Sequence, residues 1–326
     1  MTLPRIPVDA PFDLNPIGSW PSSRHVFDQT SADAILMAWA AERPLLVRGE
    51  PGTGKSQLAR AAAQMLNRAF ISEVVHARTE PQDLLWRFDT VGRLGEAQAL
   101  AARGAQSPAG GIDALDPRHF LSPGPLWWAF DWQSARQCQA GSRYKAAAPA
   151  TPAGWTPEAG CVLLIDEIDK ADSDVPNSLL ETLGNRSFSV PWLAEGTVGQ
   201  GTATPPLVII TTNEERELPA AFLRRCLVLQ YELPDDIVPW LISRGRIHFS
   251  PEVCSNDVLE AAARQLAKDR IDARRAGVTP PGQAEYLDLL KALSTLRAVE
   301  AEQLDLLKQL SRFAYRKFRE DKPRGG

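Results

Sequence analysis

The stretch that decides the fold is Gly49-Glu50-Pro51-Gly52-Thr53-Gly54-Lys55-Ser56, which matches the pattern G-x-x-x-x-G-K-[S/T]. The apolar run Pro44–Gly49 (PLLVRG) before it predicts a buried strand, and Ser56–Phe70 (SQLARAAAQMLNRAF) after it predicts a helix. Glycines let backbone N–H groups turn inward around phosphate oxygens, and the helix adds its positive end. Lys55 would reach the β- and γ-phosphates of ATP, and the Ser56 hydroxyl would bind Mg²⁺. The sequence therefore predicts a phosphate-binding loop that uses all of these residues.

A second apolar run, Gly160–Glu167 (GCVLLIDE), ends in two carboxylates. Ligands of open α/β sheets bind at the carboxyl ends of the strands, so Asp166 and Glu167 would face the phosphates. We expect Asp166 to hold Mg²⁺ with Ser56, and Glu167 to orient and polarise the attacking water. The alternative, an acidic strand end that only caps the next helix, is disfavoured because the phosphate loop is present.

Two further polar groups lie at later strands. Asn213 closes the apolar run 206–213 (PLVIITTN), where its amide could position water near the γ-phosphate, although asparagine after a strand is also a common turn former. Arg224 and Arg225 precede a fifth predicted strand within 225–233. They either pair with a local carboxylate or project into the ATP site of a neighbouring subunit, where they would neutralise charge in the transition state.

The rest of the chain alternates between strand and helix patterns. The predicted elements are a helix that begins at Thr30/Ser31, a strand over 71–77, a helix over 175–183 that ends at Gly184, a short extended piece at 187–192, a flexible loop over 194–206, and helices near 235–244, 256–269, 282–292 and 299–319. This alternation predicts an α/β fold with a mostly parallel sheet. We divide the chain into an N-terminal arm (1–30), a nucleotide-binding core (31–234) with an insert around 91–160, and a C-terminal helical module (235–326).

Charge and hydropathy limit the classes of function. The 36 basic and 40 acidic side chains give a net charge of −4, which argues against bulk coating of nucleic acid. One stretch near the C-terminus is rich in basic residues: Arg312, Arg316, Lys317, Arg319, Lys322 and Arg324. For this stretch, a solvated tail is favoured over a nucleic-acid contact. No apolar run is long enough to span a bilayer, so we expect a cytoplasmic protein without a membrane partner.

Several aromatic, cysteine and histidine residues carry no clear signal of chemistry. Trp127, Trp128 and Trp132 could grip a partner, but packing in the core is favoured. The cysteines show no zinc-type spacing, and Cys161 and Cys226 are expected to be buried thiols. His76 ends a predicted strand, and a structural role or weak ligand sensing is favoured over a role as catalytic base.

The four motifs together resemble the AAA+ superfamily. GEPGTGKS, LLIDEIDKAD, IITTNEERELP and AFLRRC occur in that order and spacing, and residues 76–89 and 121–130 resemble its MoxR and dynein-related branch. The resemblance covers roughly residues 30–235. It implies a P-loop NTPase three-layer αβα sandwich with a five-stranded parallel sheet of order 5-1-4-3-2, a helical lid and a ring, usually hexameric, with ATP at the subunit interfaces. It also implies a sensor-1 role for Asn213, and it places Arg225 ahead of Arg224 as the arginine finger.

The lid departs from this pattern. Relatives often carry a sensor-2 arginine before a lid helix, where this chain has Gln283 and Ala284. Either Arg274 or Arg275 substitutes from upstream, or lid closure does not read the γ-phosphate in this way.

The resemblance favours a MoxR-like ATPase that uses ATP and Mg²⁺ to remodel or activate a separate partner protein, for which von Willebrand factor A-type proteins are one class. One alternative is a nucleic-acid-directed motor of the restriction type, in which GTP could replace ATP. Another is a scaffold that assembles with ATP and turns it over slowly, although an intact Glu167 argues against it. A simple kinase or monomeric GTPase would leave the Asp-Glu pair, Asn213 and the arginines unexplained.

Overall fold

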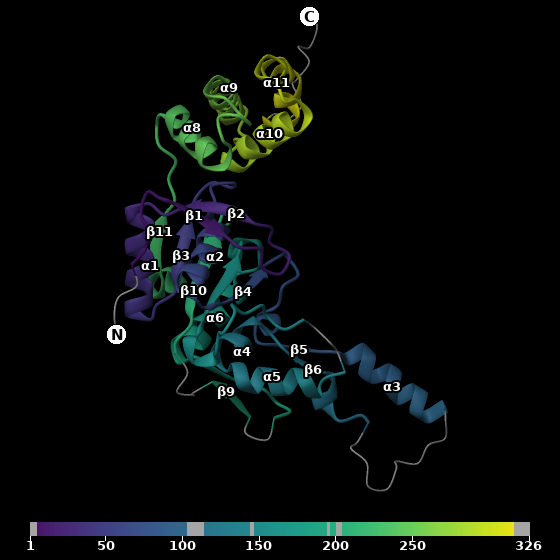
Figure 1. Cartoon of the computed structure of the whole chain (residues 1–326). Coiled ribbons are helices and arrows are strands. Elements are labelled where there is room, and N and C mark those ends of the chain that lie inside the picture. Colours follow the sequence, from purple (N-terminus) through teal and green to yellow (C-terminus); the bar gives the residue numbers. More distant parts are fainter. Residues whose placement is uncertain (1–4, 103–113, 144–146, 194–195, 200–203, 316–326) are drawn as a thin grey trace, which may run out of the picture.

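A five-stranded parallel sheet forms the centre of the molecule. The computed structural model describes residues 5–102, 114–143, 147–193, 196–199 and 204–315. The strands run in the order β11-β3-β10-β7-β4, which is the expected order 5-1-4-3-2 (Figure 1). Their bounds are β3 Leu45–Arg48, β4 Ala69–Val74, β7 Cys161–Asp166, β10 Leu207–Thr212 and β11 Leu227–Gln230.

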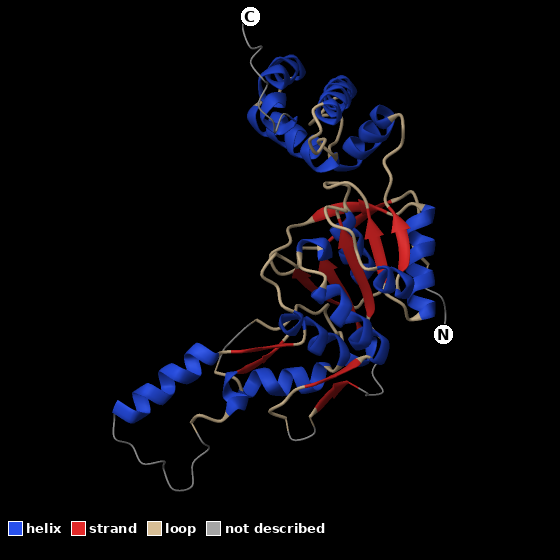
Figure 2. Cartoon of the chain, turned by 180° about the vertical axis from the view of Figure 1, so that it is seen from behind, coloured by secondary structure: helices blue, strands red, loops and turns tan. Residues whose placement is uncertain are grey.

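Helices cover both faces of the sheet (Figure 2), and alternate residues of the strands supply two separate cores, one on each face. Val162 and Leu164 pack with α1 (Gln29–Ala41) and α2 (Lys55–Met65). Leu163 and Ile165 face the other way, toward two further helices, α4 (Pro125–Phe130) and α6 (Asp174–Asn185). Both faces are covered, which explains why these strands read as continuous apolar runs rather than alternating ones.

Two predicted helix ends were wrong because side chains and backbone turns decide them. Helix α1 begins at Gln29 rather than after Thr30/Ser31, because the Asp28 carboxylate accepts a hydrogen bond from the Ser31 amide at 2.7 Å. Helix α2 ends at Met65 rather than Phe70. Asn67 takes a positive φ of 51°, and the chain then enters β4 two residues earlier than predicted.

The segment after β7 also differs from the predictions. Helix α6 runs through Gly184, and Arg186 takes the left-handed cap conformation with φ of 50°. Within the expected loop over 194–206, the described residues include β9 (Thr197–Gly199), which pairs antiparallel with β8 (Ser187–Ser189). Backbone pairing with β8, which the apolar pattern did not reveal, orders this piece. The short elements here and before β11 are η4 Ile168–Lys170 and α7 Ala220–Arg225.

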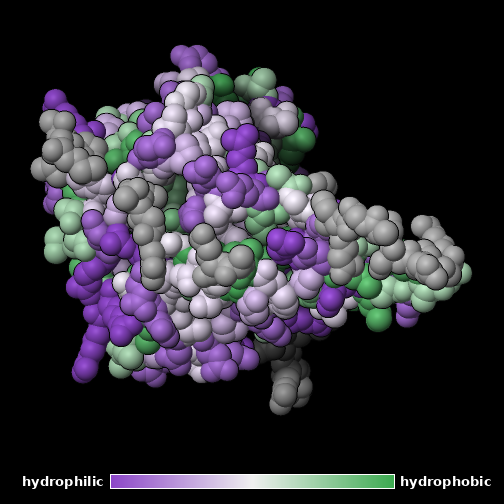
Figure 3. All heavy atoms as spheres, turned by 90° about the horizontal axis from the view of Figure 1, so that it is seen from below, coloured by the Kyte–Doolittle hydropathy of each residue, from purple (hydrophilic) through white to green (hydrophobic). Residues whose placement is uncertain are grey.

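The insert contains regular structure where the composition suggested little. Two short elements, η1 Pro81–Leu84 and β5 Trp86–Phe88, precede it, and its own elements are α3 Thr90–Ala102, η2 Pro117–Phe120, β6 Leu121–Pro123, α4, α5 Trp132–Gly141 and η3 Pro157–Ala159. Trp127 is fully buried and Trp128 is 5% exposed, so packing in the core is confirmed for both. Helix α3 projects from the body of the molecule and has no buried residue (Figure 1). In the surface view from below, hydrophobic side chains are visible on this projecting part (Figure 3).

The arm and the lid lie at the carboxyl edge of the sheet. The arm forms a hairpin of β1 (Pro11–Leu14) and β2 (Ser23–Val26) that packs on α2. The lid has a core of its own and contains α8 Ile237–His248, α9 Asn256–Arg275, α10 Gln283–Leu296 and α11 Glu300–Tyr315. Arg316, Lys317, Arg319, Lys322 and Arg324 of the basic stretch lie outside the described residues.

The predicted buried cysteines are found in the interior. Cys161 and Cys226 are 2% and 6% exposed, and burial raises the pKa of each thiol to about 12. Both thiols therefore stay protonated and unreactive at neutral pH. Among the described helices, none combines the length and the apolar character that a bilayer crossing requires.

Candidate active site

The predicted phosphate loop connects β3 to α2 at the carboxyl edge of the sheet. Gly52 and Gly54 take positive φ angles of 75° and 96°, which favour glycine. Gly49 also has a positive φ, of 148°, and a Cβ there would in addition lie 2.5 Å from the carbonyl oxygen of Tyr231. The Thr53 hydroxyl donates to the Glu50 carbonyl at 2.9 Å, which closes the turn. Conformation and close packing thus both require glycine in this loop.

Lys55 lies inside the loop and is 6% exposed. Its Nζ donates to the carbonyl oxygens of Gly49 and Glu50, both at 2.8 Å. Burial lowers the pKa of Lys55, while Asp166 and nearby carboxylates act in the opposite direction. The loop carbonyls therefore hold this ammonium group where phosphate oxygens could replace them as acceptors.

Ser56, Asp166 and Thr211 form one hydrogen-bonded group across three elements. The Ser56 hydroxyl lies 2.9 Å from each carboxylate oxygen of Asp166. Thr211, near the end of β10, donates from its hydroxyl to Asp166 Oδ1 at 2.5 Å and accepts from the Glu167 amide at 2.9 Å. The parallel pairing of β10 with β7 brings these side chains together. Thr211 therefore orients Asp166 toward Ser56.

Glu167 follows β7 in the left-handed conformation, with φ of 60°. A non-glycine residue in this region is uncommon and often belongs to a functional site. Both of its carboxylate oxygens are engaged: Asn213 Nδ2 donates to Oε1 at 3.1 Å, and Lys170 Nζ lies 2.7 Å from Oε2. The hydrogen bond to Glu167 raises the pKa of Lys170. The sequence predicted that Asn213 would lie near the γ-phosphate, but it indicated neither its contact with Glu167 nor the part played by Lys170.

The two candidate finger arginines lie at the end of α7, just before β11 begins. This is the amino end of the strand, whereas the phosphate loop lies at the carboxyl ends of the strands. Arg225 donates from Nη1 to the carbonyl oxygen of Leu180 at 2.5 Å. The Arg224 side chain is exposed and has no hydrogen-bond or ion-pair partner within the described part of the chain. Arg43 donates to the carbonyl oxygens of both arginines and so holds the end of α7 in place. Neither Arg224 nor Arg225 lines the pocket at the phosphate loop of its own chain.

The lid meets the phosphate loop through residues that the sequence only partly indicated. Gln283 and Ala284 line the pocket, as the position of a sensor-2 residue requires. Arg274 of α9 reaches Glu50 of the loop with Nη2 to Oε1 at 3.0 Å, whereas Arg275 lies 3.9 Å from Asp272 within its own helix. Of the two upstream arginines considered, Arg274 is thus the one that contacts the loop.

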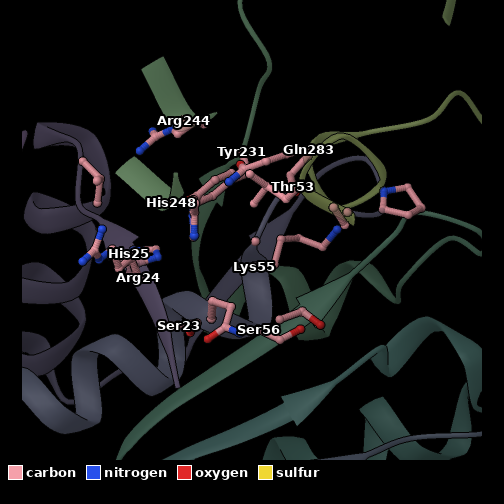
Figure 4. A pocket seen from close by; sticks show the side chains of 18 of the residues that line it. Ser23, Arg24, His25, Thr53, Lys55, Ser56, Tyr231, Arg244, His248 and Gln283 are labelled. Carbon is pink, nitrogen blue, oxygen red and sulfur yellow. The ribbon is translucent and has the colours of Figure 1, made fainter. Parts of the chain in front are cut away.

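Arm, core and lid enclose one cavity of about 430 Å³ beside the phosphate loop (Figure 4). Lys55 and Ser56 lie at its phosphate end. On the other side the arm contributes Arg24 and His25, and the lid contributes Trp240, Arg244, Ile247 and His248. Burial and the charge of Arg244 lower the pKa of His25 to about 4, so its imidazole is neutral at pH 7.

Sequence reasoning missed this second side of the cavity entirely. The sequence indicated only an N-terminal arm over residues 1–30, yet Arg24 donates from Nη1 to the carbonyl oxygen of Ile247 in the lid at 2.5 Å. No local pattern in a segment rich in Pro, Asp and Ser marks such residues. His76, by contrast, is exposed and outside the cavity, and its Nδ1 accepts from the Arg78 amide at 3.2 Å.

The fold and the loop between β3 and α2 define a P-loop nucleotide-hydrolysing protein of three αβα layers with an added helical lid. The AAA domain family of the dynein-related subfamily matches residues 44–226, more than half of the chain. The chain therefore belongs to this family, and it is an ATP-hydrolysing enzyme that binds nucleotide. No curated protein is similar enough in sequence to match it.

Solved structures with a related arrangement of elements share little sequence with this chain. A point variant of RuvB from Thermotoga maritima has 13% identity and a TM-score of 0.46, covering 87% of this chain and 69% of that one. RuvB from the same organism, described as a Holliday junction branch migration motor, has 14% identity and a TM-score of 0.41, covering 90% and 70%. A protein of Cytophaga hutchinsonii assigned as an ATPase has 13% identity and a TM-score of 0.39, covering 86% and 78%. The family assignment rests on the domain match alone.

Proposed function

We propose that the chain is a MoxR-like AAA+ ATPase that hydrolyses ATP with Mg²⁺ at the subunit interfaces of a ring, usually hexameric, and thereby remodels or activates a separate partner protein. The observation that carries the proposal is the set of groups around the phosphate loop: Ser56 with Asp166, and Glu167 with Asn213. The first pair would bind the metal and the second would orient the attacking water. Asp166, Glu167 and Asn213 lie at the carboxyl ends of the adjacent strands β7 and β10.

The residues present fit a magnesium ion. Mg²⁺ prefers oxygen ligands and is usually held by one or two protein groups together with phosphate oxygens and water. The Ser56 hydroxyl and the Asp166 carboxylate supply such oxygens 2.9 Å apart beside the loop. Held by Ser56 and Asp166, such an ion would supply positive charge against the charge that develops on the phosphate oxygens. Thr211 keeps Asp166 turned toward Ser56.

Glu167 is the residue proposed to polarise the attacking water. Asn213 and Lys170 each engage one carboxylate oxygen of Glu167 and orient the group, and each oxygen keeps a further lone pair with which it can accept a hydrogen bond from water. Asn213 would then orient the same water, the sensor-1 role expected from the resemblance. Lys55, now bonded to the Gly49 and Glu50 carbonyls, would turn to the β- and γ-phosphates.

Arginine supplied by a neighbouring subunit completes the proposed site. Arg224 and Arg225 end α7 at the edge of the sheet opposite the phosphate loop, and neither lines the nucleotide cavity of its own chain. They could therefore serve only another copy. The resemblance favours Arg225, whose guanidinium donates to the Leu180 carbonyl, whereas the Arg224 side chain has no partner among the described residues, so both belong in the test. An arginine finger is worth roughly 10³-fold or more in turnover.

The proposed partner is a protein rather than nucleic acid. The net charge of −4 argues against binding that rests on bulk charge. The resemblance to the MoxR branch supports a separate polypeptide, with von Willebrand factor A-type proteins as the expected class. Helix α3, which projects with Val91 82% exposed and Leu94 58% exposed, gives such a partner an accessible surface beside the core.

ATP turnover in mixed assemblies tests the shared site. Glu167→Gln removes the water-polarising group of its own subunit, while Arg224→Ala and Arg225→Ala remove the group offered to the neighbour. Each variant alone should lose most of the turnover, and specific activity of the wild type should rise with protein concentration. Mixing Glu167→Gln with the inactive arginine variant should restore activity, because the mixture contains complete interfaces. Arg264→Ala, an exposed lid arginine, serves as the matched control and should behave as wild type.

Other outcomes point to other functions. Turnover that neither rises with concentration nor depends on either arginine would exclude a shared site. Stimulation by double-stranded DNA that disappears with added salt would favour the nucleic-acid motor over protein remodelling. Assembly in ATP with little turnover would favour the scaffold.

A further inference from the structure

The lid touches the phosphate loop through backbone atoms at the start of α10. The amide of Ala284 donates to the carbonyl oxygen of Gly52 at 3.1 Å. Gly282 packs so closely that a Cβ there would lie 2.9 Å from the carbonyl oxygen of Pro51. The first amides of a helix have no partner within the helix, so this bond satisfies a donor that would otherwise be open. The lid therefore rests directly on the loop.

An ion-pair cluster joins the same two parts of the chain beside this contact. Arg270 Nη2 lies 2.5 Å from Glu50 Oε2, and Arg274 Nη2 lies 3.0 Å from Glu50 Oε1. The two arginines are four residues apart on α9 and so share one face of the helix. Each carboxylate oxygen of Glu50 thus accepts a hydrogen bond from one arginine of the lid, although the partners are more than 200 residues apart in the sequence.

Burial makes this cluster more than a surface ion pair. The side chain of Arg270 is 5% exposed, and its second hydrogen bond goes to the carbonyl oxygen of Pro281. A guanidinium in this environment needs its carboxylate, since a buried charge without a partner is costly. Burial by itself would raise the pKa of Glu50, but the hydrogen bonds and charges of Arg270 and Arg274 outweigh it, and the pKa lies below its usual value. Glu50 is therefore ionised at neutral pH.

We propose that Arg270 is a positioning residue for ATP turnover. Through its ion pair with Glu50, Arg270 couples the lid to the phosphate loop. This inference rests on the assignment of Gly49–Ser56 as the phosphate loop and goes beyond it. It supplies a link between lid and nucleotide at a site where Gln283 and Ala284 offer no charge to the γ-phosphate.

A continuous set of contacts carries the coupling. The Glu50 carbonyl accepts from Lys55 Nζ at 2.8 Å, and the Glu50 side chain accepts from Arg270. When Lys55 turns to a bound phosphate, the backbone at Glu50 loses that contact, and the loop can adjust. The ion pair passes the adjustment to α9, so that lid position depends on the state of the loop. Arg274, whose side chain is 62% exposed, contributes less than Arg270.

A double-mutant cycle on ATP turnover tests the coupling. Glu50→Gln and Arg270→Gln each remove one charge, and each should lower kcat/KM by about tenfold or more. The double variant should be no worse than the poorer single variant, because both changes break the same contact. Arg270→Lys keeps the charge and should recover part of the loss. Arg264→Gln, on the same helix but paired with Glu260, is the matched control and should stay within about twofold of wild type.

Hydrogen exchange at the Ala284 amide gives a second readout in the same proteins. Exchange there should quicken in both single variants while the interior of α9 stays protected, which separates undocking from unfolding of the lid. The proposal is overturned if the effects of Glu50→Gln and Arg270→Gln multiply in the double variant. It is also overturned if Glu50→Gln behaves as wild type while Arg270→Gln unfolds the lid, since Arg270 would then be structural.

The phosphate loop has its own test, independent of this cycle. Lys55→Ala should abolish binding of ATP, whether or not the lid is coupled. If Lys55→Ala still binds ATP normally, the assignment of the loop fails. If Lys55→Ala loses binding and the cycle is multiplicative, the loop stands and only the coupling fails.

Discussion

Replacement of Gly282 by alanine is expected to separate the lid from the phosphate loop. Gly282 precedes α10 with φ of −120° and ψ of −163°, which alanine also adopts, so the added methyl group acts through space alone. Its Cβ would lie 2.9 Å from the carbonyl oxygen of Pro51, which is a backbone atom and cannot rotate away. Relief of this contact requires the two segments to move apart by about 0.5 Å.

The structure sets the size of the effect. A shift of this kind stretches the bond between the Ala284 amide and the Gly52 carbonyl, now 3.1 Å, beyond the range of a hydrogen bond. That loss costs about 1 kcal/mol, and the steric strain adds about 1–3 kcal/mol. Together they lower the equilibrium constant for docking of the lid by roughly 30-fold or more.

Hydrogen exchange followed by mass spectrometry measures this directly. The Ala284 amide lies at the second position of α10 and has no acceptor within the helix, so its protection reports the contact with Gly52. Exchange at Ala284 should quicken in Gly282→Ala, and KM for ATP should rise. Gly95→Ala, in open space within α3, is the control and should change neither quantity. Unchanged exchange at Ala284 together with unchanged KM would refute the steric argument.

Three further predictions concern the core, the arm and the arginine corner. Trp127→Ala empties a fully buried site and should lower the free energy of unfolding in urea by about 3–5 kcal/mol. The pKa of His25 is lowered to about 4, so the contribution of the neutral imidazole to stability is complete above pH 6.5 and is lost as pH falls toward 4. The loss amounts to at most about 3 kcal/mol of unfolding free energy. His25→Phe should therefore show a smaller fall in Tm over this pH window than the wild type. Arg43→Ala frees the carbonyl oxygens of Arg224 and Arg225, and should lower turnover on the order of tenfold without weakening ATP binding.

Each of these predictions has a matched control. Phe313→Ala removes an aromatic ring that is 71% exposed and should cost less than about 0.5 kcal/mol. His76→Phe changes an exposed histidine and should leave the pH dependence of Tm as in wild type. Arg264→Ala should retain full turnover. A Trp127→Ala protein as stable as wild type, a His25→Phe protein with the same pH dependence, or an Arg43→Ala protein that loses ATP binding would each contradict its prediction.

The parts of the fold that the sequence predicted correctly depend on local patterns. The runs before Gly49, at 160–167 and at 206–213 became β3, β7 and β10 because a strand buried on both faces needs nearly every side chain to be apolar. The loop between β3 and α2 could be predicted as a phosphate loop because its glycines and Lys55 lie within eight consecutive residues. The errors fell at element ends, where a single side chain such as Asp28 or a left-handed residue such as Asn67 decides the boundary.

The sequence by itself therefore determined the class of fold, the phosphate loop and the pair Asp166–Glu167, since each depends on residues that are neighbours along the chain. Only the tertiary structure decided what surrounds them: the arm that supplies His25, the lysine that holds Glu167, and Arg270 against Glu50. The physical reason is that these contacts depend on how strands, arm and lid are placed in space. Arg270 on α9 contacts Glu50, 220 residues earlier in the sequence, only when the lid packs on the loop, and no local periodicity in the sequence indicates that contact.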